Sequence, residues 1–229
     1  LSVTGSLTLE AWVRQESVPV SGDIEFILNK AGSYSLFYEN ENGAKKIKAN
    51  IGSDVAILPY DLQTGIWHHI AVTFSPNTHT FKWYIDGISV LQTATAISSI
   101  SDSANVLTIG GVNSSNLGFD GNIDEVRVLS SARSANEISA GYKNQLFGNE
   151  ANLRAYWRFN GDYTDKTNNG NTATGTVSIG DDVPFSGGCT GGEDIDSETA
   201  LPLPPFLANY MYTYDQVGNI KRIVTTSDI

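Results

Sequence analysis

One loop of the chain, residues 162–171, has side chains suited to a hard cation. Calcium takes about six to eight oxygen ligands, which Asp, Asn and backbone carbonyls in a glycine-containing loop supply. Asp165, Asn168 and Asn171 have this chemistry, so the loop predicts a structural calcium site. The alternative is an ordinary turn held by Asp and Asn side chains, and Lys166 beside the carboxylate favours it.

A second group of residues has the chemistry of sugar binding. Sugars stack their apolar faces on aromatic rings, while nearby Asn and Asp groups bind their hydroxyls. The candidates are the aromatic residues of loops and strand ends, namely Tyr34, Tyr38, Tyr60 and Tyr163. Their alternative role is that of ordinary edge residues. The tryptophans lie inside strand motifs, which indicates core packing for Trp12, Trp67, Trp83 and Trp157.

One run of carboxylates imitates a catalytic pattern but lacks a strand to position it. Asp194-Ile195-Asp196-Ser197-Glu198 places carboxylates on alternate residues, as glycosidases place a nucleophile and an acid. It follows Gly191-Gly192 and precedes a proline-rich run, so no strand is expected there. His68 and His69 point to opposite faces of a strand, so one is expected to be packed and the other exposed. The sequence predicts no catalytic residues.

Composition and charge exclude several partners. The 229 residues include 40% hydrophobic and 17% charged residues, which is typical of a folded protein. Lys and Arg total 14 against 25 acidic residues, and the net charge of -11 repels nucleic acid and anionic lipid. No stretch has the length of a membrane span. The single cysteine, Cys189, forms no intramolecular disulfide and has no partners for zinc.

Alternation of apolar and polar residues predicts an all-β protein. In residues 6–13, Leu7, Leu9, Ala11 and Val13 share one face of a strand. Further runs lie at 25–28, 34–38, 45–51, 55–58, 67–74, 81–85, 88–91, 106–110, 121–129, 153–159 and 172–179. Short strands at short spacing are typical of an antiparallel β-sandwich.

Local signals place two turns and one helix. Ser75-Pro76-Asn77-Thr78 contains turn formers between two strands, and Asp86-Gly87 supplies the positive φ angles of a tight turn. Three adjacent antiparallel strands are therefore expected. Ser134 and Glu137 form a capping-box pattern, which predicts a helix over 135–142.

Composition also divides the chain into three parts. A sandwich is expected over residues 1–180, closed by 153–179. Residues 181–207 are rich in Gly, acidic residues and Pro, which is typical of a linker. Residues 208–229 contain two short strand patterns around a turn-rich loop, which predicts a hairpin.

Four motifs occur in a fixed order: LTLEAWV at 7–13, WHHIAVTF at 67–74, WYIDG at 83–87 and GNIDEVRV at 121–128. Together they resemble the laminin-G-like, concanavalin A-type jelly-roll domains. The resemblance covers roughly residues 1–145 and implies a jelly-roll sandwich with a binding function. In related domains the Asp of the last motif often ligates a structural cation, which adds Asp124 to the predicted calcium ligands.

A fifth motif of this family stands in an unusual place. AYWRF at 155–159, followed by Asp165 and Asn169-Gly170-Asn171, resembles the segment that usually begins the domain. Either a second, decayed copy begins at Leu153, or this segment completes one sandwich in a permuted order. Completion is favoured, because the first sandwich alone would leave a bare strand edge and an exposed apolar face.

The end of the chain carries a different motif. YTYDQVGNI at 212–220 resembles the YD repeat of RHS-type proteins, which build large β-hairpin shells. One unit forms no shell. With a start at Leu1 that lacks an export signal, the motif leads us to expect an internal piece of a large exported bacterial polypeptide.

These patterns predict a non-catalytic binding or adhesion module at the cell surface or outside the cell. Its expected partners are glycans or surface proteins, with structural calcium as cofactor and without nucleic acid or membrane insertion. Two alternatives are a structural spacer before an RHS-type shell and a remote glycoside hydrolase.

Overall fold

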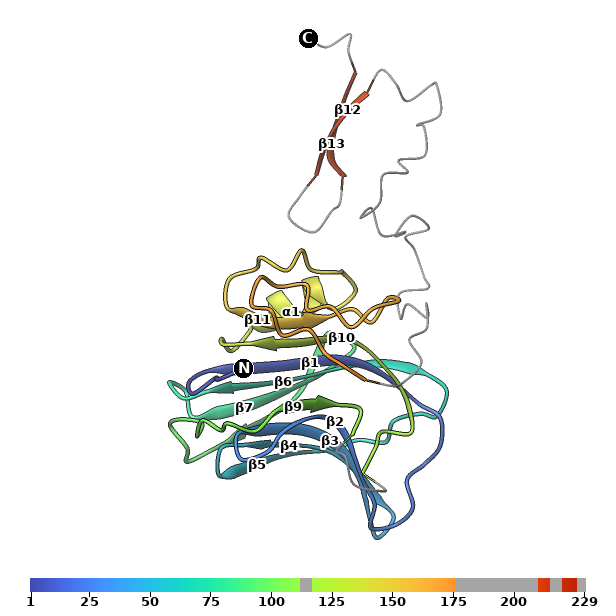
Figure 1. The fold of residues 1–229 in the computed structure, drawn as a ribbon, viewed down its shortest axis with the longest axis vertical. Helices are drawn as coiled ribbons and strands as arrows, with labels where there is room; N and C mark the ends of the chain where they lie inside the picture. The colour runs from blue at the N-terminus through green and yellow to red at the C-terminus, as the bar shows by residue number, and fades with distance from the viewer. Residues whose placement is uncertain (112–116, 176–209, 215–219, 226–229) are drawn as a thin grey trace. The chain divides into compact units, whose positions relative to one another are not determined.

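The protein consists of two units, both of which contain antiparallel β-structure. A computed structural model describes residues 1–111, 117–175, 210–214 and 220–225. The two units are Leu1–Pro184 and Phe185–Ile229. The first contains a six-stranded sheet, a five-stranded sheet and one short helix (Figure 1), which confirms the predicted all-β jelly-roll sandwich.

The six-stranded sheet contains the predicted hairpins. Its spatial order is β11 (Leu153–Trp157), β10 (Gly121–Leu129), β1 (Leu7–Gln15), β6 (Trp67–Ser75), β7 (Thr80–Ile85) and β8 (Ile88–Ala94). The turn between β7 and β8 has φ angles of 49° at Asp86 and 77° at Gly87, as the Asp-Gly pair predicts. Strands β6, β7 and β8 are therefore the three adjacent antiparallel strands expected from the sequence.

The five-stranded sheet is built mainly from one meander. Its order is β5 (Asp54–Pro59), β4 (Ala44–Ile51), β3 (Tyr34–Glu41), β2 (Ile24–Lys30) and β9 (Leu107–Ile109). All pairings in it are antiparallel. The outer face of this sheet carries the candidate ligand site.

Alternate residues of the two sheets form one hydrophobic core. Leu7, Leu9, Ala11 and Val13 of β1 are all fully buried, as the alternation predicts. The same core contains Trp83 and Trp157. Packing is thus the role of these tryptophans.

Residues 130–150, the cover segment, pack on the outer face of the six-stranded sheet. Within this segment α1 (Ala135–Gly141) begins with the predicted capping box, in which Ser134 and Glu137 bond each other's backbone amides. Ile138 of α1 packs against Ala71 and Tyr84 of the sheet. This face of the sheet is therefore closed to ligands where the cover segment packs.

The segment after the cover segment returns to the sandwich. Strand β11 hydrogen-bonds to β10 at the edge of the six-stranded sheet. The loop that follows folds back on β11, because Lys166 N–H donates to the Tyr156 carbonyl and Trp157 Nε1–H donates to the Asn171 carbonyl. The strand predicted at 172–179 is not formed by residues 172–175, and its remainder lies outside the described residues.

The second unit contains the hairpin predicted near the end of the chain. Strands β12 (Tyr210–Tyr214) and β13 (Ile220–Thr225) pair antiparallel. The expected linker, 181–207, and the carboxylate run 194–198 lie outside the described residues. Among the described residues, no helix has the length and apolar character needed to cross a membrane.

Candidate functional site

The outer face of the five-stranded sheet carries a row of small polar side chains beside an aromatic pair. Register places Ser35 of β3 between Asn29 of β2 and Asn50 of β4. Phe26 and Phe37 form the adjacent row, with ring centroids 5.4 Å apart. Side chains in such cross-strand positions are direct neighbours on one face of a sheet.

A surface hollow of about 390 Å³ opens at this row. This volume falls in the range of about 300–1,000 Å³ that is usual for small-molecule sites. The lining residues used below are Phe26, Asn29, Ser33, Ser35, Asn50 and Gly52. The hollow thus combines one aromatic ring with amides and hydroxyls.

The polar side chains of the hollow differ in how many of their hydrogen bonds are made within the protein. Asn50 Nδ2 donates to Ser35 Oγ at 3.1 Å, which leaves the Asn50 carbonyl oxygen and its second N–H for a ligand. Ser33 is 3% exposed, and its Oγ has no hydrogen-bond partner. A buried hydroxyl without a partner costs about 1–3 kcal/mol, so a bound hydroxyl there would stabilise the fold as well as the complex.

The charges near the hollow are already paired. Lys30 Nζ donates to the carbonyls of Ser103 and Asn105, both at 2.7 Å. Lys48, on the same outer face, forms an ion pair with Glu39 and lies 3.6 Å from Glu41. Apart from Lys30, whose ammonium group is occupied by the Ser103 and Asn105 carbonyls, the side chains that line the hollow are uncharged.

The tyrosines predicted to bind sugars do not lie together on this face. Tyr34 is 1% exposed with its hydroxyl bonded to the Leu1 carbonyl, and Tyr38 is fully buried with its hydroxyl bonded to Asp61. Both rings are buried in the core and are not exposed for stacking on a sugar, although Tyr34 borders the hollow. Tyr60 and Tyr163 are half-buried and stay candidates, after β5 and β11 respectively.

Asp165, the centre of the predicted calcium loop, is a buried hydrogen-bond acceptor. Its Oδ1 accepts from the backbone amides of Tyr156 and Thr167, and its Oδ2 accepts from the backbone amide and side chain of Asn171. The Thr167 hydroxyl is also within hydrogen-bond distance of both oxygens. Donors at both oxygens do not fit a bound cation, which needs these lone pairs.

The other predicted calcium ligands are spread over different environments. Asp124 is buried on β10, where its Oδ1 accepts from the Glu125 amide at 2.7 Å, and Asn168 is exposed. Among the described residues there is no group of three or more His, Cys, Asp or Glu side chains placed to hold a metal. Calcium binding at Asp124 and Asp165 stays a prediction, and no group of metal-ligating side chains among the described residues supports it.

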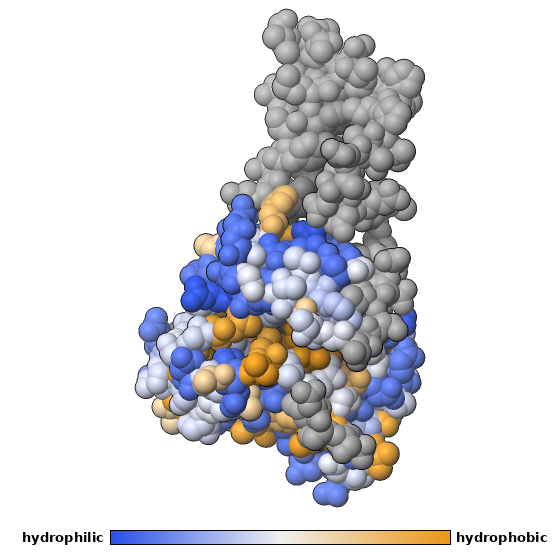
Figure 2. Space-filling view, in the orientation of Figure 1, coloured by the Kyte–Doolittle hydropathy of each residue, from blue (hydrophilic) through white to orange (hydrophobic). Residues whose placement is uncertain are grey.

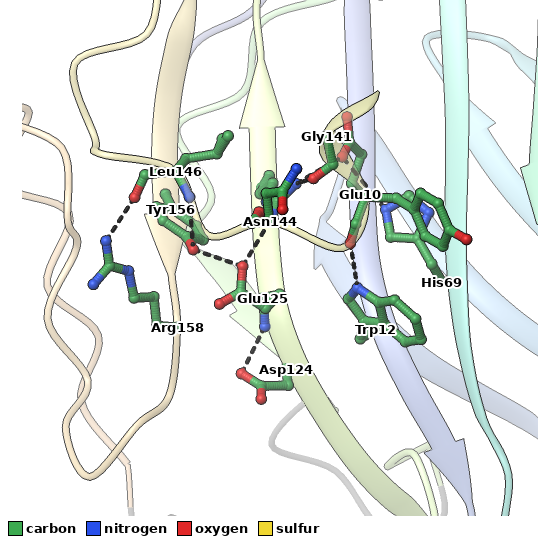
Figure 3. A network of polar contacts seen from close by, with 12 residues as sticks. Glu10, Trp12, His69, Asp124, Glu125, Gly141, Asn144, Leu146, Tyr156 and Arg158 are labelled. Atoms are coloured by element: carbon green, nitrogen blue, oxygen red, sulfur yellow. Dashed lines mark hydrogen bonds and ion pairs between the residues drawn. The ribbon is translucent and has the colours of Figure 1, made fainter. Parts of the chain in front are cut away.

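A buried ionic network lies between the six-stranded sheet and the cover segment (Figure 3). Arg127 donates to Glu125 at 2.7 Å, and Arg133 donates to Glu10 at 2.7 Å. Arg127 also donates to the carbonyls of Gly141 and Asn144. These bonds attach the cover segment to β1 and β10, so the network has a structural role.

The ionisation states in the network follow from its geometry. Burial alone would raise the pKa of Glu10, but His69, Arg133 and Arg127 together lower it. Burial lowers the pKa of His69 more than Glu10 raises it, so the ring is neutral and its 3.4 Å contact with Glu10 is weak. The two carboxylates of the network thus face two guanidinium groups, and only the Arg133 guanidinium is partly exposed.

Both adjacent histidines are buried, contrary to the prediction that one would be exposed. His68 is 8% exposed and His69 is 1% exposed. His68 faces the end of the core, where Nδ1 lies 3.0 Å from Asp86 Oδ2. His69 points to the opposite face, which the cover segment closes through Tyr142.

Glu25, at the start of β2, is a carboxyl group with acidic neighbours. Gln15 Nε2 donates to its Oε2 at 3.2 Å. Burial, with the charges of Asp120 and Asp23, raises the pKa of Glu25 to about 7. The folded state therefore retains a proton on Glu25 at pH values where the unfolded chain has lost it.

This proton makes the stability of the fold depend on pH. Since the folded pKa is the higher one, the stabilisation is complete below pH 4.5 and is lost as pH rises through 7. Glu25→Gln is expected to raise the free energy of unfolding at pH 8 by up to roughly 3 kcal/mol and to change it little at pH 4. Urea unfolding at both pH values measures this. Glu16→Gln, an exposed neighbour, is the control, and an equal gain at both pH values would contradict the assignment.

The sequence contained a signal for the hollow that the tyrosine hypothesis did not use. Along β3 and β4, Ser35 and Asn50 alternate with the apolar residues Leu36 and Ala49. Such alternation marks polar residues of the outer face. The depth of the hollow was not predictable, because it depends on the β2–β3 turn at Gly32 and Ser33.

Comparison with known families agrees with this architecture. Residues 1–139 match a laminin G domain model described as the concanavalin A-like lectin/glucanases superfamily, and the chain belongs to this family. The match ends inside α1, so β11 and the loop after it lie outside the matched part. No curated protein matches the sequence.

Solved structures share the fold at low sequence identity. A candidate carbohydrate-binding protein from Bacteroides ovatus superposes with a TM-score of 0.60 at 21% identity, over 70% of this chain and 47% of the other. The full extracellular region of zebrafish Gpr126/Adgrg6 superposes with a TM-score of 0.51 at 17% identity, over 69% of this chain and 22% of the other. The chain thus spans about half the length of the first of these proteins.

Proposed function

We propose that the chain is a non-catalytic carbohydrate-binding module whose ligand binds in the hollow on the five-stranded sheet. The observation that carries the proposal is the lining of the hollow, where the Phe26 ring lies among amides and hydroxyls. An aromatic ring accepts the C–H face of a sugar, and convergent polar groups orient its hydroxyls. The membership of a lectin and glucanase superfamily and the likeness to a candidate carbohydrate-binding protein support it.

The distribution of carboxylates supports binding without hydrolysis. Glycoside hydrolysis normally needs two carboxyl groups beside the scissile bond. The described residues that line the hollow include no Asp or Glu. Glu10 and Glu125 are neighbours of the same buried network, but they are 0% and 1% exposed and are bonded to arginines.

The setting of the module is part of the same proposal. An exported or surface-attached parent protein would bring the module to extracellular glycans, and the sequence resemblance of residues 212–220 to a YD repeat supports such a parent. Figure 2 shows a mixed surface in which apolar patches lie beside hydrophilic ones, consistent with recognition at a surface.

A glycan array with the full chain tests the proposed function. We expect reproducible binding to a subset of glycans and at least a tenfold weaker affinity for Phe26→Ala, since the ring supplies most of the apolar contact. Phe147→Ala removes a ring of 61% exposure from the cover segment and should leave binding unchanged. Arrays in calcium and in EDTA show whether the predicted cation contributes. No binding in either buffer would favour the structural spacer.

A further inference from the structure

Apart from Lys30, the polar side chains that line the hollow are neutral. Asn29 and Asn50 offer amides, and Ser33 and Ser35 offer hydroxyls. An amide or a hydroxyl both donates and accepts, which matches the sugar hydroxyl, itself a donor and an acceptor. A carboxylate or sulfate group offers acceptors only and brings a charge that these groups do not neutralise.

Lys30 is the one cationic residue among the described residues that line the hollow, and its ammonium group is already hydrogen-bonded. Lys30 is 5% exposed, and its ammonium group donates to two carbonyls of the segment that precedes β9. To reach an anionic ligand it would have to break both bonds and leave two carbonyl groups without a donor. Leaving both carbonyls without their donor is unfavourable, so Lys30 does not act as an anion receptor.

The electrostatic potential around the hollow is also unfavourable for anions. On the same face Lys48 is neutralised by Glu39 and Glu41, and the whole chain carries a net charge of -11. An anionic sugar would therefore lose its hydration without gaining a counter-ion, which is costly in a partly buried site.

From these three observations we infer that the hollow selects neutral saccharides and rejects sialylated, sulfated and uronic acid glycans. The inference rests on the proposed function and specifies its ligand class. The sugar ring lies on Phe26, and its hydroxyls bond the Asn29 and Asn50 amides and the unpartnered Ser33 hydroxyl.

Pairs of glycans that differ only by a terminal sialic acid test the inference on the full chain. We expect the capped member of each pair to bind at least tenfold more weakly than the neutral one at low salt, with a smaller difference at high salt. Asn50→Ala should weaken neutral glycans at least tenfold, whereas Asn77→Ala, an exposed residue of the β6–β7 turn, should not. Melting temperatures confirm that each variant is folded.

A charge inserted into the hollow separates the possible outcomes. Asn50→Lys is expected to reduce the discrimination against capped glycans, because it adds the missing counter-ion. Preferential binding of acidic glycans that Phe26→Ala abolishes would overturn the inference and keep the proposed function. Neutral binding that Asn50→Ala leaves intact would also overturn it, and a silent array would overturn both.

Discussion

Replacing Arg127 with methionine is expected to lower the free energy of unfolding by about 3–5 kcal/mol, the usual cost of breaking a buried ion pair from one side. The guanidinium is fully buried and bonds Glu125, together with two carbonyls of the cover segment. Without it, the Glu125 Oε2 atom still accepts a hydrogen bond from the Tyr156 hydroxyl but has lost its counter-ion. Urea unfolding followed by tryptophan fluorescence measures the loss.

Two further variants separate the charge from the packing. Arg154→Met changes an exposed arginine on β11 and should alter stability by less than about 0.5 kcal/mol. Adding Glu125→Gln to Arg127→Met removes the uncompensated carboxylate and should recover part of the loss. A double variant less stable than the single one would show that charge balance is not what Arg127 provides.

Gly148→Ala is expected to be the most damaging glycine substitution among those at which the φ angle is positive. At Gly148 φ is 95°, and an added Cβ would lie 1.9 Å from the Lys166 carbonyl oxygen. A left-handed φ costs a residue with a Cβ about 1–3 kcal/mol, and the clash with backbone forces the two loops apart at a further cost of about 1–3 kcal/mol. Thermal and urea unfolding measure the sum.

Gly161→Ala isolates the first of these costs. Its φ is 76°, and an added Cβ would meet nothing within 4 Å. The difference between the two variants is therefore the cost of the clash between the added Cβ and the Lys166 carbonyl. Equal effects at Gly148 and Gly161 would mean that the cover segment and the loop after β11 do not touch in solution.

The strands and their turns were predictable because their determinants are local. The Asp86-Gly87 turn needs only two residues with positive φ, and the capping box of α1 needs only Ser134 and Glu137. Alternation within β1 likewise identified its buried face from four apolar residues.

The orientation of β3 needed information from another strand. Alternation divides β3 into the set with Tyr34 and Tyr38 and the set with Ser35 and Phe37, and both sets contain aromatic residues. The pairing with β4 settles the choice, because it places Ile47, Ala49 and Ile51 beside the first set. The burial of Tyr34 and Tyr38 was not predicted because register is not a local property.

Burial of the second face of the six-stranded sheet was equally non-local. His69 and Glu10 belong to strands whose polar residues normally face water. They are buried because the cover segment, more than a hundred residues after β1, packs over them through Arg133 and Tyr142. In the cover segment the sequence predicted only a helix, from its capping box, and did not indicate on which face of the sheet the helix would pack.

The central place of β1 in the six-stranded sheet has a consequence for how the chain folds during synthesis. β1 is made first, but its two neighbours, β6 and β10, begin at Trp67 and Gly121. One edge of β1 therefore has no sheet partner until β6 has been made, and the other has none until β10 has been made. Folding that depends on contacts between residues far apart in the sequence is slow. An apolar strand that stays unpaired during this time favours aggregation. A nascent chain of this kind gains most from being kept apart from its copies until β10 is available.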